Sequence, residues 1–312
     1  MSVFRMAVGI TIVDTADDRS AASGFLAVSR VRIDGDVVKF CQATTEGYEI
    51  ESVIIPMGAR DKTWRTLCVS SQIGCARGCT FCQTGRMGML RNLTAAEIVG
   101  QLGAARLHFG ANIRNVVFMG MGEPFDNFEN VIAAIRAMHN HRTDPIPRRR
   151  ITVSTVGRCD GIRRLAALGW RRLKLAVSLN ASNDEIRSRI MPINRTDSMA
   201  ALRDAIGAYP VRAGGHVLIE YVLLGGVNDA THHAEELAAY LRGLATCVNL
   251  IPWNPCDGLP FEAPTEENIL RFQETLMRLG QLTFRRNTKG RQAMAACGQL
   301  GNPGLRRGLF LR

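Results

Sequence analysis

The sequence predicts an α/β protein in which a small antiparallel β module precedes a parallel sheet. Two patterns in the 312 residues indicate this class: an early hairpin signal, and apolar runs that alternate with helix-like stretches from residue 66 onward. Six strand–helix units in succession imply parallel strands joined by right-handed crossovers. Such a sheet is either doubly wound or curled into an open partial barrel. Because no GxGxxG follows the first strand, a dinucleotide-binding fold is disfavoured.

The amino-terminal module is predicted from short β-rich runs. Runs at residues 25–33 and 37–43 are joined by Asp34-Gly35-Asp36, a strong hairpin signal, and a third run covers residues 48–56. Residues 57–63 are expected to form a polar connector. The expected domains are the module with its connector at 1–64, the core at 65–300 and a basic tail at 301–312.

The core is predicted as alternating strands and helices. Expected strands cover residues 66–70, 115–119, 151–154, 173–178, 217–224 and 247–252, with a final strand at 282–286. Expected helices cover residues 94–108, 128–140, 161–168, 183–189, 230–241 and 265–279. Thr94 precedes Glu97 by three residues, the pattern of a capping box, and Thr265 is likewise expected to begin the last helix.

Composition narrows the class of protein. Hydrophobic residues make up 46% and charged residues 21%, which is typical of a globular chain and excludes disorder as the main state. The formal net charge of +11 suits a polyanionic partner such as nucleic acid but does not require one. No apolar run is long enough to span a membrane, and the amino terminus is a poor secretory signal. We therefore expect a cytoplasmic location.

The cysteines point to metal chemistry. Their number, nine, is odd, which argues against a disulfide scaffold. Cys75, Cys79 and Cys82 have the spacing C-x3-C-x2-C, in a loop that contains Gly74 and Gly78. Three thiolates can hold a [4Fe–4S] cube and leave one iron open to substrate or cofactor. A zinc site is a weaker alternative, because a structural zinc site needs four ligands and a catalytic zinc site usually includes His. A second alternative is that the three cysteines are buried structural thiols that bind no metal.

Polar residues follow the ends of the predicted strands. If the sheet is a barrel, functional residues should lie at the carboxyl ends of its strands. Each residue alone could be a helix cap or a turn, but together they suggest a rim that binds a polar cofactor. Gly122 allows close backbone approach, and the Glu123 carboxylate can accept hydrogen bonds from an ammonium group. The residues of this rim are Gly122, Glu123, Ser154, Ser178, Asn180 and Asn254.

The cysteine loop resembles that of the radical S-adenosylmethionine (SAM) superfamily, whose core is a partial (β/α)6 barrel. More specifically, the chain resembles the RlmN/Cfr-type RNA methyltransferases, which modify adenosine at carbon 2 or carbon 8. The resemblance covers roughly residues 48–300 and rests on the segments LCVSSQIGCARGCTFCQTG, VVFMGMGEP, ITVSTVG, LAVSLN, NLIPWNP and AACGQL. It implies a partial (β/α)6 radical SAM barrel with a small amino-terminal antiparallel β module. It also implies a [4Fe–4S] cluster and two SAM molecules per turnover.

The resemblance also implies roles for individual residues. Cys297 would carry the methyl group as an S-methylcysteine, and Cys68 would form a transient disulfide with Cys297 that releases the product. Glu51 would be the proton acceptor. The cluster ligands would be Cys75, Cys79 and Cys82, and the SAM site would be lined by Gly122, Glu123, Ser154, Ser178, Leu179, Asn180 and Asn254.

The family further implies structured RNA (rRNA or tRNA) as partner, an electron donor such as flavodoxin or ferredoxin, no membrane partner, and a monomer. Basic runs at residues 148–150 and 171–174 could contact phosphates.

The sequence is expected to depart from the family pattern in four respects. We expect no helical domain before the β module, although members of the family usually have one. The other three are Lys-Gly-Arg-Gln-Ala at residues 289–293 in place of acidic residues, a longer loop between residues 56 and 65, and Asn180 in place of His. They leave two alternatives open: a radical SAM methylase of a small molecule or peptide, and a non-catalytic zinc-stabilised RNA-binding module.

Overall fold

The computed structural model describes residues 2–5, 11–14, 26–59, 62–286, 290 and 293–301. In this part of the chain, one 12-stranded sheet runs in the order β1-β2-β3-β4-β5-β6-β9-β10-β11-β12-β13-β14, and β7 and β8 form a separate two-stranded sheet. Most of residues 1–25 and of the expected basic tail, and residues 289, 291 and 292 of the segment that departs from the family, lie outside the described residues.

The first half of the sheet is antiparallel. Its strands are β1 (Ser2–Arg5), β2 (Thr11–Asp14), β3 (Val28–Asp34), β4 (Val37–Ala43), β5 (Glu49–Ala59) and β6 (Lys62–Cys68). The predicted β3–β4 hairpin is confirmed, and Gly35 in its turn has the positive φ of 58° that favours glycine.

The prediction of a polar connector at residues 57–63 is wrong. β5 and β6 continue as paired strands through this region, with Met57 opposite Trp64. Trp64 lies under the guanidinium of Arg114, 4.5 Å from the ring centroid to Cζ, so a strand with polar residues is still stabilised by a side-chain stack. The expected domain boundary at residues 64 and 65 therefore falls inside β6, in a sheet that is continuous across it.

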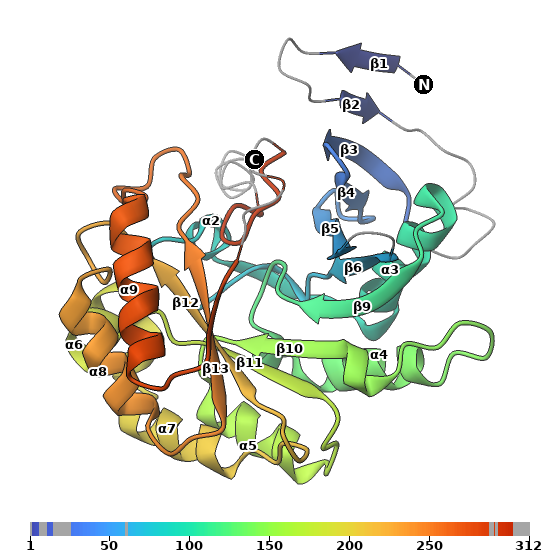
Figure 1. Ribbon diagram of the computed structural model, residues 1–312. Coiled ribbons are helices and arrows are strands. Elements are labelled where there is room, and N and C mark those ends of the chain that lie inside the picture. Colours follow the sequence, from blue (N-terminus) through green and yellow to red (C-terminus); the bar gives the residue numbers. More distant parts are fainter. Residues whose placement is uncertain are drawn as a thin grey trace.

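The second half of the sheet is parallel. β6 pairs in parallel with β9, and each later strand pairs in parallel with the one before it. Figure 1 shows these strands curving around, with helices on their outer side. β6 and β14 are not neighbours in the described sheet, so the barrel is open, as the family resemblance implies. The strands are β9 (Ile113–Phe118), β10 (Ile151–Thr155), β11 (Lys174–Ser178), β12 (Val217–Leu223), β13 (Thr246–Pro252) and β14 (Thr283–Arg285).

The predicted helices are present with small shifts at their ends. They are α3 (Ala95–Phe109), α4 (Phe128–His139), α5 (Cys159–Ala167), α6 (Asp184–Ile190), α8 (Thr231–Leu241) and α9 (Glu266–Arg278). Both predicted caps are confirmed: Thr94 and Glu97 form a reciprocal capping box, and the Thr265 side chain accepts from the Asn268 N–H.

Several short elements were not predicted. α7 (Met199–Ala208) carried a signal, because Ser198 caps it and Met199, Leu202, Ala205 and Ile206 are buried at helical spacing. The others are too short for a periodic pattern to appear. They are α2 (Gln83–Met87), β7 (Gln72–Gly74), β8 (Met89–Asn92), and the 3₁₀ turns Pro124–Asn127, Arg148–Arg150 and Pro192–Arg195.

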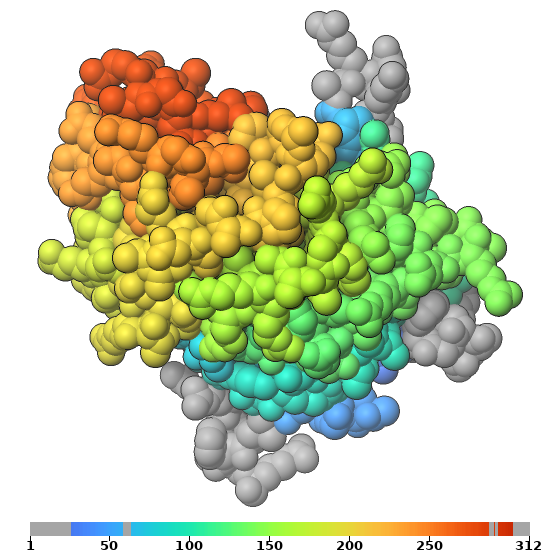
Figure 2. Space-filling view, turned by 90° about the horizontal axis from the view of Figure 1, so that it is seen from below, coloured from blue at the N-terminus to red at the C-terminus, as the bar shows by residue number. Residues whose placement is uncertain are grey.

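The core fills the space between the sheet and the outer helices. Seen from below, the segments follow one another around the surface in chain order, as expected when each unit packs against its neighbours in the sequence (Figure 2). A smaller apolar cluster joins residues 293–300 to the amino-terminal module and the first barrel strands: Ala293, Ala295 and Leu300 pack with Val37, Val53, Cys68 and Met121. None of the helices among the described residues is long and apolar enough to cross a membrane.

Candidate active site

The cysteine loop follows β6 and is shaped by glycine. A Cβ on Gly74 would lie 1.8 Å from the carbonyl oxygen of Gly88, and one on Gly85 would lie 2.8 Å from that of Cys79. Only glycine fits at these positions, so the loop can fold tightly enough to turn Cys75, Cys79 and Cys82 into one cavity. The spacing seen in the sequence is therefore matched by a convergence of the three side chains on one space.

The donor set fits an iron–sulfur cluster. Three thiols from one loop, without imidazole, are the ligands that such a cluster prefers. Burial raises the pKa of the Cys75 thiol to about 12 and also raises those of Cys79 and Cys82, so binding would need metal ions to stabilise the thiolates. In the described part of the chain, no group of three His, Cys, Asp or Glu side chains is arranged to hold a single metal ion.

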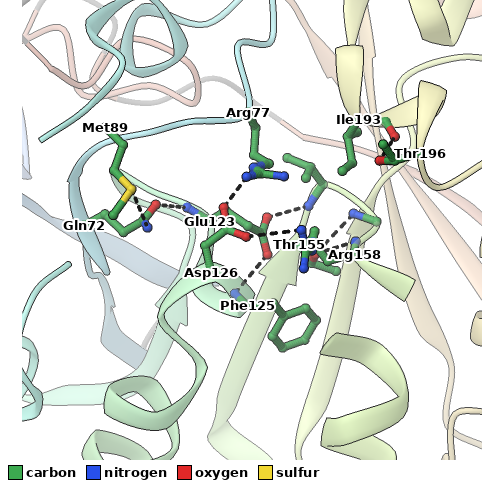
Figure 3. A network of polar contacts seen from close by, with 12 residues as sticks. Gln72, Arg77, Met89, Glu123, Phe125, Asp126, Thr155, Arg158, Ile193 and Thr196 are labelled. Atoms are coloured by element: carbon green, nitrogen blue, oxygen red, sulfur yellow. Dashed lines mark hydrogen bonds and ion pairs between the residues drawn. The ribbon is translucent and has the colours of Figure 1, made fainter. Parts of the chain in front are cut away.

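Glu123 follows β9 and belongs to a network of polar contacts (Figure 3). Its carboxylate accepts hydrogen bonds from the backbone N–H groups of Phe125 at 3.0 Å and Val156 at 2.8 Å, and its own N–H donates to Gln72 Oε1 at 2.8 Å. Burial raises the pKa of Glu123 to about 7 despite these donors. A Cβ on neighbouring Gly122 would lie 2.6 Å from the Gln72 side chain, so the turn needs glycine there.

One cavity, which we call the main cavity, gathers most of the predicted residues. Its lining includes Cys75, Cys79, Cys82, Gly122, Glu123, Ser154, Ser178, Asn180 and Cys297. Asn180 has a positive φ of 57°, a conformation that Asn tolerates better than most residues, and its side-chain oxygen accepts from the Val222 N–H at 2.9 Å. These contacts tie the end of β11 to β12 and hold the Asn180 side chain at the cavity wall.

Two predicted cofactor-binding residues lie outside the main cavity. The Leu179 side chain is fully buried in the main core. Asn254 lines an adjoining space, the barrel cavity, which is also lined by Glu220, Asn249, Arg286 and Cys297. Asn254 is 2% exposed and its Oδ1 has no hydrogen-bond partner in the described part, so this atom is available to a bound molecule.

The two cysteines with expected roles in methyl transfer, Cys68 and Cys297, lie near each other. Cys297 lines both the main cavity and the barrel cavity. Cys68 is buried at the end of β6; burial raises the pKa of its thiol to about 12, and the nearby Cys297 adds to the rise. The structure thus brings together two cysteines 229 positions apart in the chain, counted as 297 − 68.

Glu51 is near this site but not in the same cavity. It lines a third space, the module cavity, together with Arg30, Arg32, Lys39, Cys41 and the segment that carries Cys297. Its carboxylate forms an ion pair with Lys39 at 2.7 Å. The structure therefore places Glu51 beside the segment that carries Cys297, with its carboxylate facing Lys39 and not the lining of the main cavity.

Sequence reasoning missed three charged residues at the site: Lys39, Glu220 and Arg286. Glu220 is 5% exposed, and its carboxylate accepts from Asn249 Nδ2 at 2.7 Å. The charge of Arg286 acts on Cys297, Cys68 and Glu220. A signal existed only for Glu220, since a lone carboxylate inside an apolar strand is costly to bury unless it has a partner or a function.

Comparisons with known proteins agree with this geometry. A sequence profile described as the radical SAM superfamily matches residues 69–240. The chain is 45% identical over 283 residues to the "Probable dual-specificity RNA methyltransferase RlmN 1" of Protochlamydia amoebophila, covering 91% of this chain and 78% of that protein. It is also 45% identical over 269 residues to the "Dual-specificity RNA methyltransferase RlmN" of Lawsonia intracellularis, covering 84% and 75% respectively.

The chain belongs to the RlmN family of radical SAM methyltransferases.

Solved structures support the same family. The crystal structure of a radical SAM methyltransferase from Sphaerobacter thermophilus matches with a TM-score of 0.81 at 44% identity, covering 88% of this chain and 80% of that one. The [FeFe]-hydrogenase maturase HydG matches with a TM-score of 0.52 at 13% identity, covering 72% and 52%, which shows a shared fold alone. Radical SAM enzymes hold a [4Fe–4S] cluster and bind SAM, and the donor set described above fits that cluster.

Proposed function

We propose that this protein methylates carbon 2 of an adenine in rRNA and tRNA, using Cys297 as the carrier of the methyl group. The observation that carries the proposal is the main cavity, where Cys297 shares one space with three cysteines suited to a cluster and with Glu123. The named relatives are dual-specificity RNA methyltransferases, and they resemble this chain over most of its length. Carbon 2 is preferred to carbon 8 because these relatives are of the RlmN type.

The proposed chemistry explains why the chain needs two further cysteines. Carbon 2 of adenine is not nucleophilic, so it cannot take a methyl group from SAM by simple displacement. When bound, the cluster and two SAM molecules per turnover supply the methyl group and the radical. Cys297 Sγ accepts the methyl group and presents it to the base. Cys68 Sγ then bonds to Cys297 Sγ while the bond from Cys297 Sγ to the transferred carbon breaks, so a disulfide forms as the methylated base leaves. A thiol reductant returns the disulfide to two thiols before the next turnover.

The other site residues position and protect these groups. Cys75, Cys79 and Cys82 hold the cluster, and Gly122, Ser154, Ser178 and Asn180 line the SAM site with Glu123. Asn254 offers its unpartnered Oδ1, and Leu179 contributes through its backbone, because its side chain is packed in the core. Glu51 accepts the proton that leaves the base. The base has to leave its stack to reach Cys297, which lines both the main cavity and the barrel cavity.

A cluster of cations at the amino ends of the barrel strands suits RNA. We call it the basic rim: Arg149, Arg171, Arg172, Lys174 and Arg212, which line one open cavity. None of these side chains forms an ion pair with another described residue. Like charges gathered without carboxylates form a surface for phosphates. Lys174 also lines the barrel cavity, so the rim adjoins the space that contains Cys297.

The remaining parts of the proposal concern partners and location. An electron donor such as flavodoxin or ferredoxin reduces the cluster, the enzyme acts as a monomer, and it works in the cytoplasm.

The proposal is tested by nucleoside mass spectrometry of rRNA and tRNA treated with the anaerobically reconstituted enzyme. We expect 2-methyladenosine from the wild type and from Cys159→Ala, a control at a buried cysteine outside the cavities described above. Cys68→Ala should accumulate RNA linked covalently to Cys297, and Cys297→Ala should give neither product nor link. The absence of methylated adenosine in both RNAs, or normal turnover by both active-site variants, would contradict the proposal.

A further inference from the structure

A buried ion pair joins two strands of the amino-terminal module. Lys39 on β4 and Glu51 on β5 are each 5% exposed, and Lys39 Nζ lies 2.7 Å from Glu51 Oε2. Charges buried this deeply are costly unless further hydrogen bonds satisfy them. The position of those further bonds therefore indicates what the pair is for.

The further bonds run to both ends of the segment that carries Cys297. Lys39 Nζ donates to the carbonyl oxygen of Met294 at 3.1 Å, three residues before Cys297. The backbone N–H of Gly301, four residues after it, donates to Glu51 Oε2 at 3.0 Å. We call residues 294–301 the cysteine segment. The ion pair thus holds this segment at its beginning and at its end.

The backbone of Met294 shows that the first of these bonds constrains the chain. Met294 has a φ of 51°, in the left-handed region that residues other than glycine rarely adopt. Its carbonyl is the one that accepts from buried Lys39. A strained conformation persists only where the surroundings hold it, and such conformations gather at functional sites.

The part of the cysteine segment that follows Cys297 forms hydrogen bonds with a different element. The carbonyl of Gly298 accepts from the Gln83 N–H at 2.9 Å, and that of Leu300 accepts from Thr84 Oγ1 at 2.6 Å. Gln83 and Thr84 belong to α2, which begins directly after Cys82. The segment is therefore suspended between the cluster loop and the Lys39–Glu51 pair.

We propose that Lys39 is a positioning residue for the methyl transfer, because its pair with Glu51 clasps the cysteine segment and sets the place of Cys297 Sγ. The inference rests on the proposed function for the roles of Cys297 and Glu51. Cys297 has to face the main cavity, the base and Cys68 in turn, and a small displacement of a reacting group costs much of the rate. The same contact fixes the orientation of the Glu51 carboxylate.

A neighbouring ion pair offers a matched control. Arg30 on β3 and Glu49 on β5 also form an ion pair on the module sheet, but their side chains are 32% and 23% exposed. No hydrogen bond joins either side chain to the cysteine segment among the described residues. Arg30→Met therefore removes a cation from the same sheet and leaves the clasp intact.

The experiment compares Lys39→Met, Lys39→Arg and Arg30→Met as reconstituted holoenzymes. Hydrogen–deuterium exchange of peptides that span residues 294–301 should rise about tenfold in Lys39→Met, because two hydrogen bonds to charged groups are lost or weakened. The kcat for RNA methylation should fall about 100-fold while KM for RNA stays within about threefold of the wild type. Lys39→Arg should recover part of both effects, and Arg30→Met should behave as the wild type.

Each outcome bears on the proposal. Unchanged exchange across residues 294–301 in Lys39→Met would overturn the clasp. A rise in KM with unchanged kcat would overturn it too, since Lys39 would then be an RNA contact. If Lys39→Met does not fold, Lys39→Gln takes its place. Should the wild type methylate no RNA, the proposed function fails, while the exchange measurement still tests the clasp.

Discussion

The two ends of the barrel differ in whether their ionisable side chains are buried or exposed. At the carboxyl ends, thiols and the carboxylate of Glu123 are buried around one cavity, and burial raises their pKa values. At the amino ends, the basic rim carries exposed cations without carboxylate partners among the described residues. The buried thiols at the carboxyl ends stay protonated until a metal ion arrives, whereas the rim at the amino ends keeps its charge and needs a polyanion.

This difference indicates that chemistry and RNA binding are separable in this protein. Buried thiols have no attraction for phosphates, whereas the rim acts through long-range charge that salt can screen. Repulsion between cations is also evident beside the rim. Burial, Arg114 and Arg149 together lower the pKa of Arg150, which is next to Arg149 in the chain. Damage at one end should therefore leave the function of the other end measurable.

The largest effect is expected from Cys79→Ala, at the carboxyl ends. Loss of one thiol ligand should remove most of the cluster and abolish SAM cleavage and methylation, a loss of at least about 1000-fold, because the radical chemistry belongs to the cofactor. Iron and sulfide analysis of anaerobic preparations gives the cluster content, and filter binding gives the RNA affinity. RNA affinity should stay within about threefold of the wild type at low salt.

Cys159→Ala is the control for that experiment, since it removes a buried thiol from the core outside the cluster loop. A Cys79→Ala protein that kept its full iron content, or that lost RNA affinity together with its iron while still folded, would break the separation between the two ends.

How well the sequence predicts a part of the site depends on how far apart in the chain the residues of that part lie. The cysteine spacing lies within eight residues, counted from Cys75 to Cys82, so the loop could be recognised directly. The strand-end residues were found because parallel strands align their carboxyl ends. The contacts of Lys39 with Met294 and of Gly301 with Glu51 span more than 200 residues and leave no local pattern.

Two other differences also have physical reasons. The polar residues at 57–63 resemble a connector, but β5 and β6 pair with each other through this region. The stack of Arg114 on Trp64 further stabilises the paired strands. Asn254 and Leu179 belong to motifs at strand ends, yet only the fold decides which side of the backbone faces the main cavity. Sequence pattern thus predicts which strands build the site more reliably than which side chains point into it.

An intermediate effect is expected at the amino ends. The triple variant Arg149→Glu, Arg171→Glu and Arg172→Glu should weaken RNA binding at low salt at least about tenfold and reduce the slope of log affinity against log salt by about 1 for each lost phosphate contact. SAM cleavage without RNA should be unchanged, because these residues do not line the main cavity. Filter binding across a salt series gives both quantities.

The matched control carries charge reversals on another face: Arg271→Glu and Arg278→Glu on α9. If this variant lost as much affinity per charge as the rim variant, general attraction and not the rim would bind the RNA. An unchanged salt slope in the rim variant would place the phosphate contacts outside the basic rim.

A further effect concerns Glu123 and depends on pH. Its pKa of about 7 in the folded protein lies above the ordinary 4.5, so the folded state binds the proton more tightly than the unfolded state. The stability that this carboxyl contributes is therefore greatest below about pH 4.5 and falls as the pH rises toward 7, by up to about 3 kcal/mol. Glu123→Gln should lack this decline. The Gln side chain has one oxygen, so the variant loses the hydrogen bond from the N–H of either Phe125 or Val156. This loss lowers the free energy of unfolding by an amount that does not vary with pH.

The measurement is the difference in free energy of unfolding between wild type and Glu123→Gln, at pH 5, 6, 7 and 8, without SAM. All other titrating groups are common to the two proteins, so the wild-type advantage should shrink as the pH rises and then level off above about pH 7. Saturating SAM should reverse the trend in the wild type alone, because an ammonium group near the carboxylate favours its charged form. A difference that stays constant with pH would mean that Glu123 is already ionised at pH 5. The contrast between a neutral carboxyl end and a charged amino end would then rest on the cysteines alone.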